Sequence, residues 1–390
     1  MSTRFHLFAA ITVLTVRLST LTALAQDLPR GQIVDEVKCA SDPTQSYALY
    51  LPSSYSADRT WSLLVGFHPA ARGRAMVETY RTAAETHGYI VAGSNNSRNG
   101  SWQVSATSIQ AMFADLGQRF AIDANRLYLT GLSGGARVAM QVALGTKAVA
   151  GVIASSAGYP DSQPRKSLPF AVFGTAGTED FNYLELRMLD RALTTPHRVA
   201  IFEGGHTLPP DSVALDAIEW LELQAMKSGR RARDEALIDR LFEKRQRAIA
   251  ASDAPAATVH LLGDLADDFG GLRDVSAAAE RAVALSKQKD VKTALARERA
   301  DDDAEARLLD DVLRLERELR DDRRRLESLG QLRDSLARCA RQADAAADST
   351  ERRRARRVLR AITMGATERV QDVEYLKLLD QYRQRGSGRI

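Results

Sequence analysis

Short apolar runs alternate with longer amphipathic stretches along the first 230 or so residues. The apolar runs are bounded by Gly, Pro, Asn, Asp or Ser, as buried strands of parallel sheets are. We expect strands at Tyr47–Leu51, Leu63–Phe67, Ile90–Ala92, Leu127–Thr130, Gly151–Ala154, Phe170–Phe173 and Val199–Phe202. The stretches between and after them predict helices at Ala75–His87, Ser105–Phe120, Ala136–Leu144, Tyr183–Leu193 and Ser212–Met226. This alternation predicts an α/β fold with a mostly parallel sheet flanked by helices.

Beyond residue 230 the pattern becomes helical throughout, with breaks near Pro255 and Gly270. Apolar residues there step by threes and fours, or by their sum, at Leu308, Val312, Leu315, Leu319, Leu326, Leu329 and Leu336. Such a heptad-like stripe indicates a long helix that packs against another helix, within the chain or in a dimer. Residues 259–285 predict a helical hairpin with a faint resemblance to a tetratricopeptide-type unit.

Composition divides the 390 residues at about the same point. About two-fifths of residues 230–390 are charged, against about one-sixth of residues 1–229, and few aromatic residues fall in the second part. We therefore expect an α/β domain over 26–228 and an all-helical, highly charged region over 229–390. Arg352 to Arg357 form a basic run, but acidic residues nearly balance the arginines of this region, which favours a solvated helix face over nucleic-acid binding.

The first 25 residues have the pattern of a secretory signal peptide. Arg4 precedes the apolar run Leu7 to Val16, and Ala23-Leu24-Ala25 resembles a cleavage site. The apolar run is shorter than the roughly 20 residues that span a bilayer, so we expect a secreted or periplasmic protein with no membrane span after cleavage.

The two cysteines, Cys39 and Cys339, lie in different regions, and neither has a local partner. We therefore expect two unpaired thiols, although an oxidising compartment would permit a disulfide between them. No cysteine–histidine cluster has metal-ligand spacing, and we predict no metal site.

The segment from Tyr128 to Arg137 carries the strongest chemical signal. It contains Gly131-Leu132-Ser133-Gly134-Gly135 between a predicted strand and a predicted helix. A serine at such a turn is raised above the sheet edge, and the positive end of the following helix faces the oxyanion that develops when it attacks a carbonyl. Gly-x-Ser-x-Gly alone is a weak signal, so Ser133 needs partners elsewhere in the chain.

A nucleophilic serine requires a base and an acid that orients the base. His206 follows Gly204-Gly205 at the end of the last predicted strand, and Asp180 follows the preceding strand in the turn Gly177-Thr178-Glu179-Asp180. Catalytic groups gather at the carboxyl ends of parallel strands. We therefore assign Ser133, Asp180 and His206 as a catalytic triad, with Glu179 and Asp161 as the competing acids.

An oxyanion hole should complete the site. The backbone N–H of Gly134, directly after the nucleophile, is one expected donor. The second normally comes from the loop after an early central strand, which here reads His68-Pro69-Ala70. Because Pro69 has no N–H, the second donor is expected at Ala70.

Residues from about 45 to 228 resemble the α/β-hydrolases of the secreted polyhydroxybutyrate depolymerase and feruloyl esterase branch. The resemblance lies in the Tyr47 to Pro52 segment, Phe67-His68, the Ser133 turn, the Gly177 to Asp180 turn and Gly205-His206. It implies a serine carboxylesterase that acts on a small or polymeric ester without a metal or organic cofactor. Two alternatives stay open: a serine peptidase on the same fold, and an inactive hydrolase-like scaffold that binds a protein partner, or a second copy, through its helical tail.

Overall fold

The computed structural model describes residues 28–161 and 165–383. The predicted signal peptide, residues 1–25, lies outside the described residues. Within the described part, eight strands form one sheet in the order β1-β2-β4-β3-β5-β6-β7-β8. The strands are β1 (Ile33–Lys38), β2 (Ser46–Tyr50), β3 (Trp61–Phe67), β4 (Tyr89–Ser94), β5 (Ile122–Leu132), β6 (Val149–Ser155), β7 (Ala171–Gly177) and β8 (His197–Phe202).

The sheet is antiparallel at one edge and parallel elsewhere. Strand β2 runs antiparallel to both β1 and β4, whereas β4, β3, β5, β6, β7 and β8 pair in parallel. This order and direction are those of the α/β-hydrolase fold, as expected. Every predicted strand is present, and β1 is an additional edge strand that the sequence analysis did not predict.

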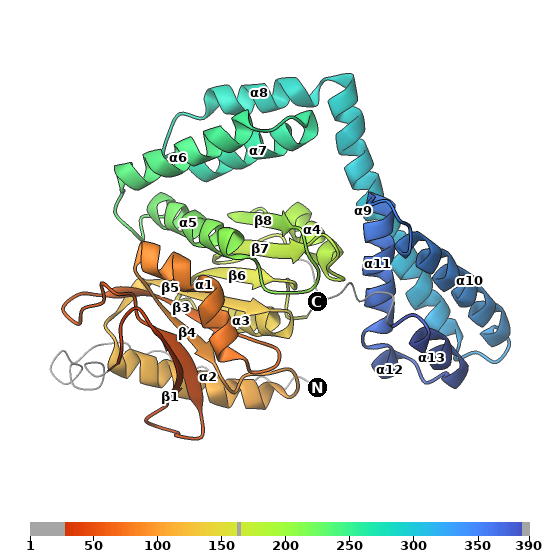
Figure 1. The fold of residues 1–390 in the computed structure, drawn as a ribbon, viewed down its shortest axis with the longest axis horizontal. Helices are drawn as coiled ribbons and strands as arrows, with labels where there is room; N and C mark the ends of the chain where they lie inside the picture. Colours follow the sequence, from red (N-terminus) through yellow and green to blue (C-terminus); the bar gives the residue numbers. More distant parts are fainter. Residues whose placement is uncertain (1–27, 162–164, 384–390) are drawn as a thin grey trace.

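Helices cover both faces of this sheet (Figure 1). On one face α1 (Gly73–His87) and α5 (Asp211–Lys227) pack into one apolar core. On the other face α2 (Trp102–Arg119), α3 (Gly134–Gly145) and α4 (Tyr183–Ala192) pack into a second. Strand β3 contributes side chains to both cores: Leu63 and Val65 lie in the core under α2, α3 and α4, and Leu64 lies in the core under α1 and α5. Side chains alternate across a strand, so a fully buried apolar run supplies both layers.

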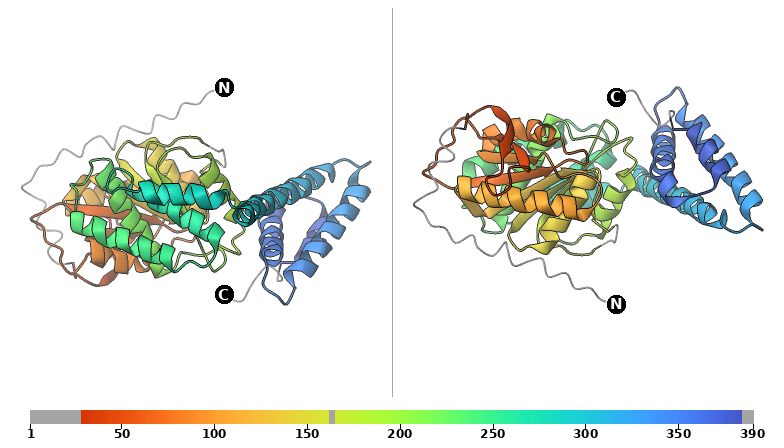
Figure 2. Two further views of the ribbon diagram at one scale, coloured as in Figure 1. Left: turned by 90° about the horizontal axis from the view of Figure 1, so that it is seen from above. Right: turned by 90° about the horizontal axis from the view of Figure 1, so that it is seen from below.

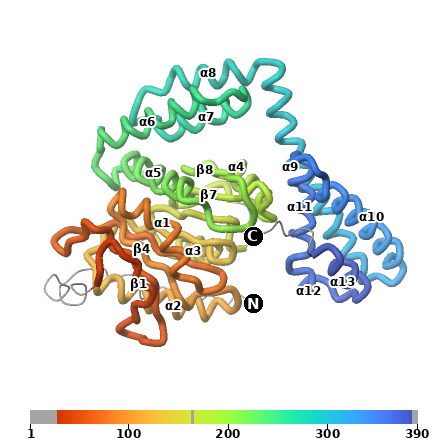
Figure 3. The backbone as a smooth tube through the Cα atoms, in the orientation of Figure 1, coloured from red at the N-terminus to blue at the C-terminus, as the bar shows by residue number. Residues whose placement is uncertain are grey.

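The remaining helices form two further groups, and Figure 3 traces the chain through them. The first group is α6 (Glu235–Ala250), α7 (Pro255–Phe269) and α8 (Ser276–Ser286), whose core includes Leu223 and Met226 of α5. Helix α9 (Lys289–Glu318) leads to the second group, α10 (Arg325–Ala343), α11 (Thr350–Thr363), α12 (Ala366–Arg369) and α13 (Val373–Asp380). Figure 2 shows this second group to one side of the sheet in both views.

The helical character of residues after 229 and the hairpin over 259–285 agree with the sequence analysis. The division into two domains at residue 228 stays a prediction. The heptad-like stripe does not lie on one long helix, because the chain turns between α9 and α10. Val312, Leu315 and Leu319 pack with Leu329 and Leu336 in a core within the chain, and Leu326 is 75% exposed.

The interpretation of the arginine run as a solvated face is wrong. Arg357 is 5% exposed and pairs with the buried Glu305 of α9, and Arg354 pairs with Asp301 of the same helix. The run reads as solvated in the sequence because its acidic partners lie about 50 residues away.

Cys39 and Cys339 are both free and buried. Within residues 28–161 and 165–383, no helix is long and apolar enough to cross a bilayer.

Candidate active site

Ser133 occupies a strained turn between β5 and α3. Its backbone has φ 53° and ψ −120°, a conformation of positive φ that residues other than Gly rarely adopt. Its backbone N–H donates to Ser155 O of β6 at 2.8 Å, which fixes the turn against the sheet. A strained backbone conformation of this kind persists only where the surrounding structure holds it in place, and such conformations cluster at functional sites.

The glycines on either side of Ser133 are required by close backbone contacts. A Cβ built on Gly135 would lie 2.0 Å from Phe67 O, and one built on Gly131 would lie 2.2 Å from Gly135 O. Strand β5, strand β3 and the first turn of α3 therefore approach more closely than any side chain permits. This packing explains why Gly is needed two residues before and two residues after the serine.

Asp180 and His206 form a hydrogen-bonded pair at the carboxyl ends of β7 and β8. His206 Nδ1 lies 2.8 Å from Asp180 Oδ1, and the same oxygen accepts the Asn182 N–H at 2.8 Å. Asp180 is fully buried, whereas the His206 side chain is 14% exposed. The Phe181 ring stacks on the imidazole with centroids 4.0 Å apart. With Nδ1 bound to the carboxylate, Nε2 is the ring nitrogen left to exchange a proton.

The two competing acids have other partners. Glu179 Oε1 accepts from Arg356 Nη1 of α11 at 2.7 Å. Asp161 is half-exposed and pairs with Arg165 at 2.6 Å. Asp180, the acid assigned from the sequence, contacts His206.

Parallel pairing of β5, β6, β7 and β8 brings the three predicted residues to one edge of the sheet. The end of β6 links them: Ser155 O accepts the Ser133 N–H, while Ser156 Oγ donates to Thr207 O at 3.4 Å, next to His206. Among the hydrogen bonds of the described residues, none joins Ser133 Oγ to His206. Such bonds are often long in enzymes without substrate and shorten in the reacting complex.

The two predicted oxyanion donors differ in their surroundings. Gly134 is the first residue of α3, where backbone N–H groups have no acceptor within the helix. The Ala70 N–H, in contrast, donates to His68 Nδ1 at 3.0 Å. Burial, with the nearby Arg72 charge, lowers the pKa of His68 to about 4, so the imidazole is neutral and accepts this bond at neutral pH. Ala70 therefore has a competing partner that the sequence analysis did not foresee.

Asn99 is a residue that the sequence analysis did not single out. It lies in the segment 95–101, between β4 and α2. Its N–H donates to Pro69 O at 2.9 Å, and a Cβ built on Gly134 would lie 1.8 Å from Asn99 Oδ1 and 3.3 Å from Nδ2. The Asn99 carboxamide thus occupies the space beside Gly134 in which a Cβ would lie.

Within the described residues, no group of three or more His, Cys, Asp or Glu side chains is placed to hold a metal ion.

No protein-family model matches the chain, and no curated protein matches its sequence. Solved structures similar to it include the feruloyl esterase module of Clostridium thermocellum complexed with sinapinate, at 14% identity over 48% of this chain and 85% of that one, with a TM-score of 0.39. A ferulic acid esterase matches at 15% identity, over 49% of this chain and 96% of that one, with a TM-score of 0.39. The esterase Est2 of Thermogutta terrifontis, bound to butyrate, matches at 13% identity over 53% of this chain and 98% of that one, also with a TM-score of 0.39. These similarities span about half of the chain, so the reaction is inferred from the residues of the site.

Proposed function

We propose that this protein is a serine hydrolase that cleaves carboxylic esters through an acyl-enzyme. The observation that carries the proposal is the hydrogen bond between buried Asp180 and His206, made at the same sheet edge where Ser133 sits on a strained turn. A carboxylate on Nδ1 fixes the imidazole in the tautomer whose Nε2 accepts a proton, which is what activation of a serine requires.

The proposed reaction has two steps. His206 Nε2 removes the proton from Ser133 Oγ as this oxygen attacks the ester carbonyl, and the imidazolium then protonates the departing alcohol. Water attacks the acyl-enzyme next, with the same imidazole as base, and the acid is released. The Gly134 N–H at the start of α3 stabilises the oxyanion in both steps.

The second oxyanion donor is proposed to be the Asn99 side chain rather than the Ala70 amide. Ala70 already donates to His68, whereas the Asn99 carboxamide lies beside Gly134 and carries two N–H groups. Which amide atom faces the oxyanion is set by its hydrogen bonds, and an oxyanion selects the NH₂ group. Loss of one oxyanion donor lowers kcat by about 10²- to 10³-fold. We therefore expect Asn99→Ala to lower kcat by a factor in this range. Asn99→Asp should lower kcat further, because it places a negative charge beside the oxyanion.

The reaction class is tested by a matched panel of p-nitrophenyl esters and p-nitroanilides. We expect the wild-type protein to hydrolyse the esters and Ser133→Ala to hydrolyse none of them. The preferred acyl group is then ranked with acyl chains from acetyl to octanoyl, hydroxycinnamoyl esters and hydroxybutyrate oligomers. Faster cleavage of the anilides would support a serine peptidase instead. Folded protein that cleaves neither class would contradict the enzyme proposal and favour a scaffold that acts through its helical tail.

A further inference from the structure

The basic run on α11 contacts the loop that carries the predicted catalytic acid. Arg356 Nη1 donates to Glu179 Oε1 at 2.7 Å, and Arg357 Nη1 donates to Thr178 O at 2.7 Å. Thr178 and Glu179 directly precede Asp180 in the chain. The two residues of each contact are far apart in the sequence, by 177 and 179 positions respectively. The helical tail is therefore packed back against the acid loop.

The same two loop residues are bound on their other side by the loop that carries His206. Thr178 N–H donates to Phe202 O and Glu179 N–H donates to Gly204 O, both at 2.8 Å. Arg353 of α11 reaches this second loop as well, at 3.0 Å from Glu203 Oε1. Helix α11 therefore contacts the acid loop and the histidine loop together, at the point where the Asp180–His206 pair is assembled.

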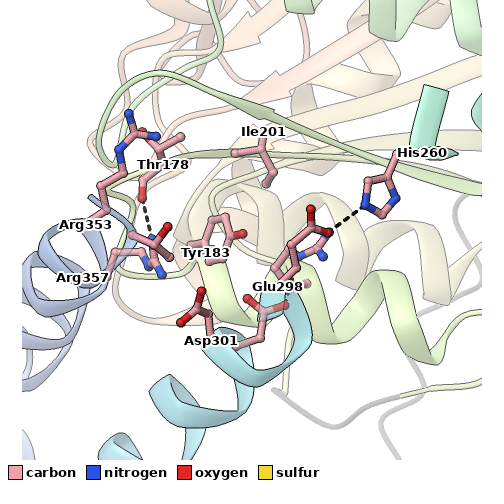
Figure 4. A pocket seen from close by; sticks show the side chains of 11 residues that line it. Thr178, Tyr183, Ile201, His260, Glu298, Asp301, Arg353 and Arg357 are labelled. Atoms are coloured by element: carbon pink, nitrogen blue, oxygen red, sulfur yellow. Dashed lines mark hydrogen bonds and ion pairs between the residues drawn. The ribbon is translucent and has the colours of Figure 1, made fainter. Parts of the chain in front are cut away.

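Helix α11 is itself held firmly. The buried Arg357 guanidinium donates through Nε to both carboxylate oxygens of Glu305 on α9, at 3.1 and 3.0 Å, and lies 4.1 Å over the Tyr183 ring. Arg360 lies 6.0 Å from the centroid of Phe181, the ring that stacks on His206. Figure 4 shows Arg357 directed at Thr178 from the tail side. Charge-assisted hydrogen bonds of this kind add geometric specificity as well as energy, so they fix the Arg357 guanidinium against Thr178 O.

The pocket beside these contacts is lined largely by charged side chains that pair with one another. Its volume is about 330 Å³, and none of Ser133, Asp180 and His206 lines it. Asp302 pairs with Arg187 and Arg191, and Glu298 pairs with His260 at 2.8 Å (Figure 4). This surface is therefore an internal contact between the tail and the sheet, and its ionic groups bind one another.

We propose that the helical tail positions the catalytic acid. Arg356 and Arg357 are positioning residues: they hold Thr178 and Glu179 from the side opposite to the histidine loop, so that Asp180 meets His206 Nδ1. The inference rests on the proposed serine hydrolase function. It assigns the tail a role in the reaction itself, where the sequence had suggested partner binding or dimerisation.

The Arg356–Glu179 pair offers the sharper test, because it is less buried than Arg357–Glu305 and its loss should leave the fold intact. The full-length chain is compared with Arg356→Ala, Glu179→Ala and the double variant, using p-nitrophenyl butyrate. Misplacement of a catalytic group by about 1 Å costs up to 10²-fold, so we expect kcat to fall by about tenfold or more with KM changed less than about twofold. The double variant should be no slower than either single one, since both remove the same contact.

Two further variants separate positioning from general destabilisation. Arg354→Ala removes an ion pair on the same helix, to Asp301 of α9, and should keep wild-type kcat. Arg356→Lys keeps a cation that can reach Glu179 and should recover most of the lost kcat. Hydrogen exchange of the peptide spanning 177–183 should be faster in Arg356→Ala than in Arg354→Ala.

Wild-type kcat and unchanged exchange in Arg356→Ala and Glu179→Ala would overturn the inference while leaving the esterase proposal standing. An equal loss of kcat in Arg354→Ala would also overturn it, because the effect would then be general. If the wild-type chain hydrolyses no ester, the proposed function fails, and the exchange comparison still decides whether α11 holds the loop.

Discussion

Replacement of Gly135 by Ala tests whether close backbone packing creates the serine turn. The new Cβ would lie 2.0 Å from Phe67 O and 2.5 Å from Phe67 C, both well inside the 3.0 Å that real Cβ contacts respect. Both atoms belong to the backbone of β3, so no flexible side chain can move aside. Helix α3 must shift by about 1 Å relative to the central strand, and Ser133 and Gly134 shift with it.

Overpacking of this kind costs about 1–3 kcal/mol of stability. A shift of about 1 Å at the nucleophile costs on the order of 10²-fold in rate. We therefore expect Gly135→Ala to lower the midpoint of thermal unfolding and to reduce both ester turnover and fluorophosphonate labelling by about that factor.

Gly330 provides the matched control. It lies within α10, and a Cβ built on it meets nothing within 4 Å. Ala is favoured over Gly inside a helix by up to about 1 kcal/mol, so Gly330→Ala should raise the unfolding midpoint slightly and leave turnover unchanged. Gly135→Ala with wild-type midpoint and turnover would refute the reasoning, as would an equal loss of stability in Gly330→Ala.

Three further predictions follow from single side chains. Asp180→Asn keeps the shape of the acid but favours the wrong imidazole tautomer, so ester turnover should fall by on the order of 10⁴-fold with the fold retained; a fall below tenfold would exclude Asp180 as the orienting acid. Burial lowers the pKa of His68 to about 4, below the roughly 6.5 of the unfolded chain, so the unfolded chain binds more protons between these values. The free energy of unfolding should therefore rise by up to about 3 kcal/mol between pH 4 and 6.5. In His68→Gln, urea unfolding should show a smaller increase over the same pH range, and an increase equal to that of the wild type would argue against this assignment. Burial raises the pKa of the Cys39 thiol to about 11 and raises that of Cys339, so native protein should resist a thiol reagent that modifies both residues in urea.

Most of the sheet could be predicted because its strands are short apolar runs between turn residues, and burial on both faces leaves little ambiguity. Strand β1 escaped prediction because it lies at the edge of the sheet, where Asp35 and Glu36 are exposed and interrupt the apolar pattern. The chain order of Ser133, Asp180 and His206 was readable because each follows a strand at the same edge of the sheet.

The parts of the site that escaped prediction depend on contacts between distant segments. Asn99 reaches Gly134 only because two loops meet, and nothing in its local pattern differs from a solvated turn. The arginines of α11 are equally unremarkable along the chain, since periodicity shows a charged face without showing its partner. The acid loop residues that they bind lie almost 180 positions earlier.

The central claim is that Ser133 is an activated nucleophile, and covalent labelling tests it most directly. Purified full-length protein is treated with a fluorophosphonate, and the modified peptide is mapped by mass spectrometry, with Ser133→Ala and His206→Gln treated alongside. We predict one adduct per chain, on Ser133, that is absent from Ser133→Ala and strongly slowed in His206→Gln. Folded wild-type protein that acquires no adduct, or acquires it equally in His206→Gln, would contradict the account.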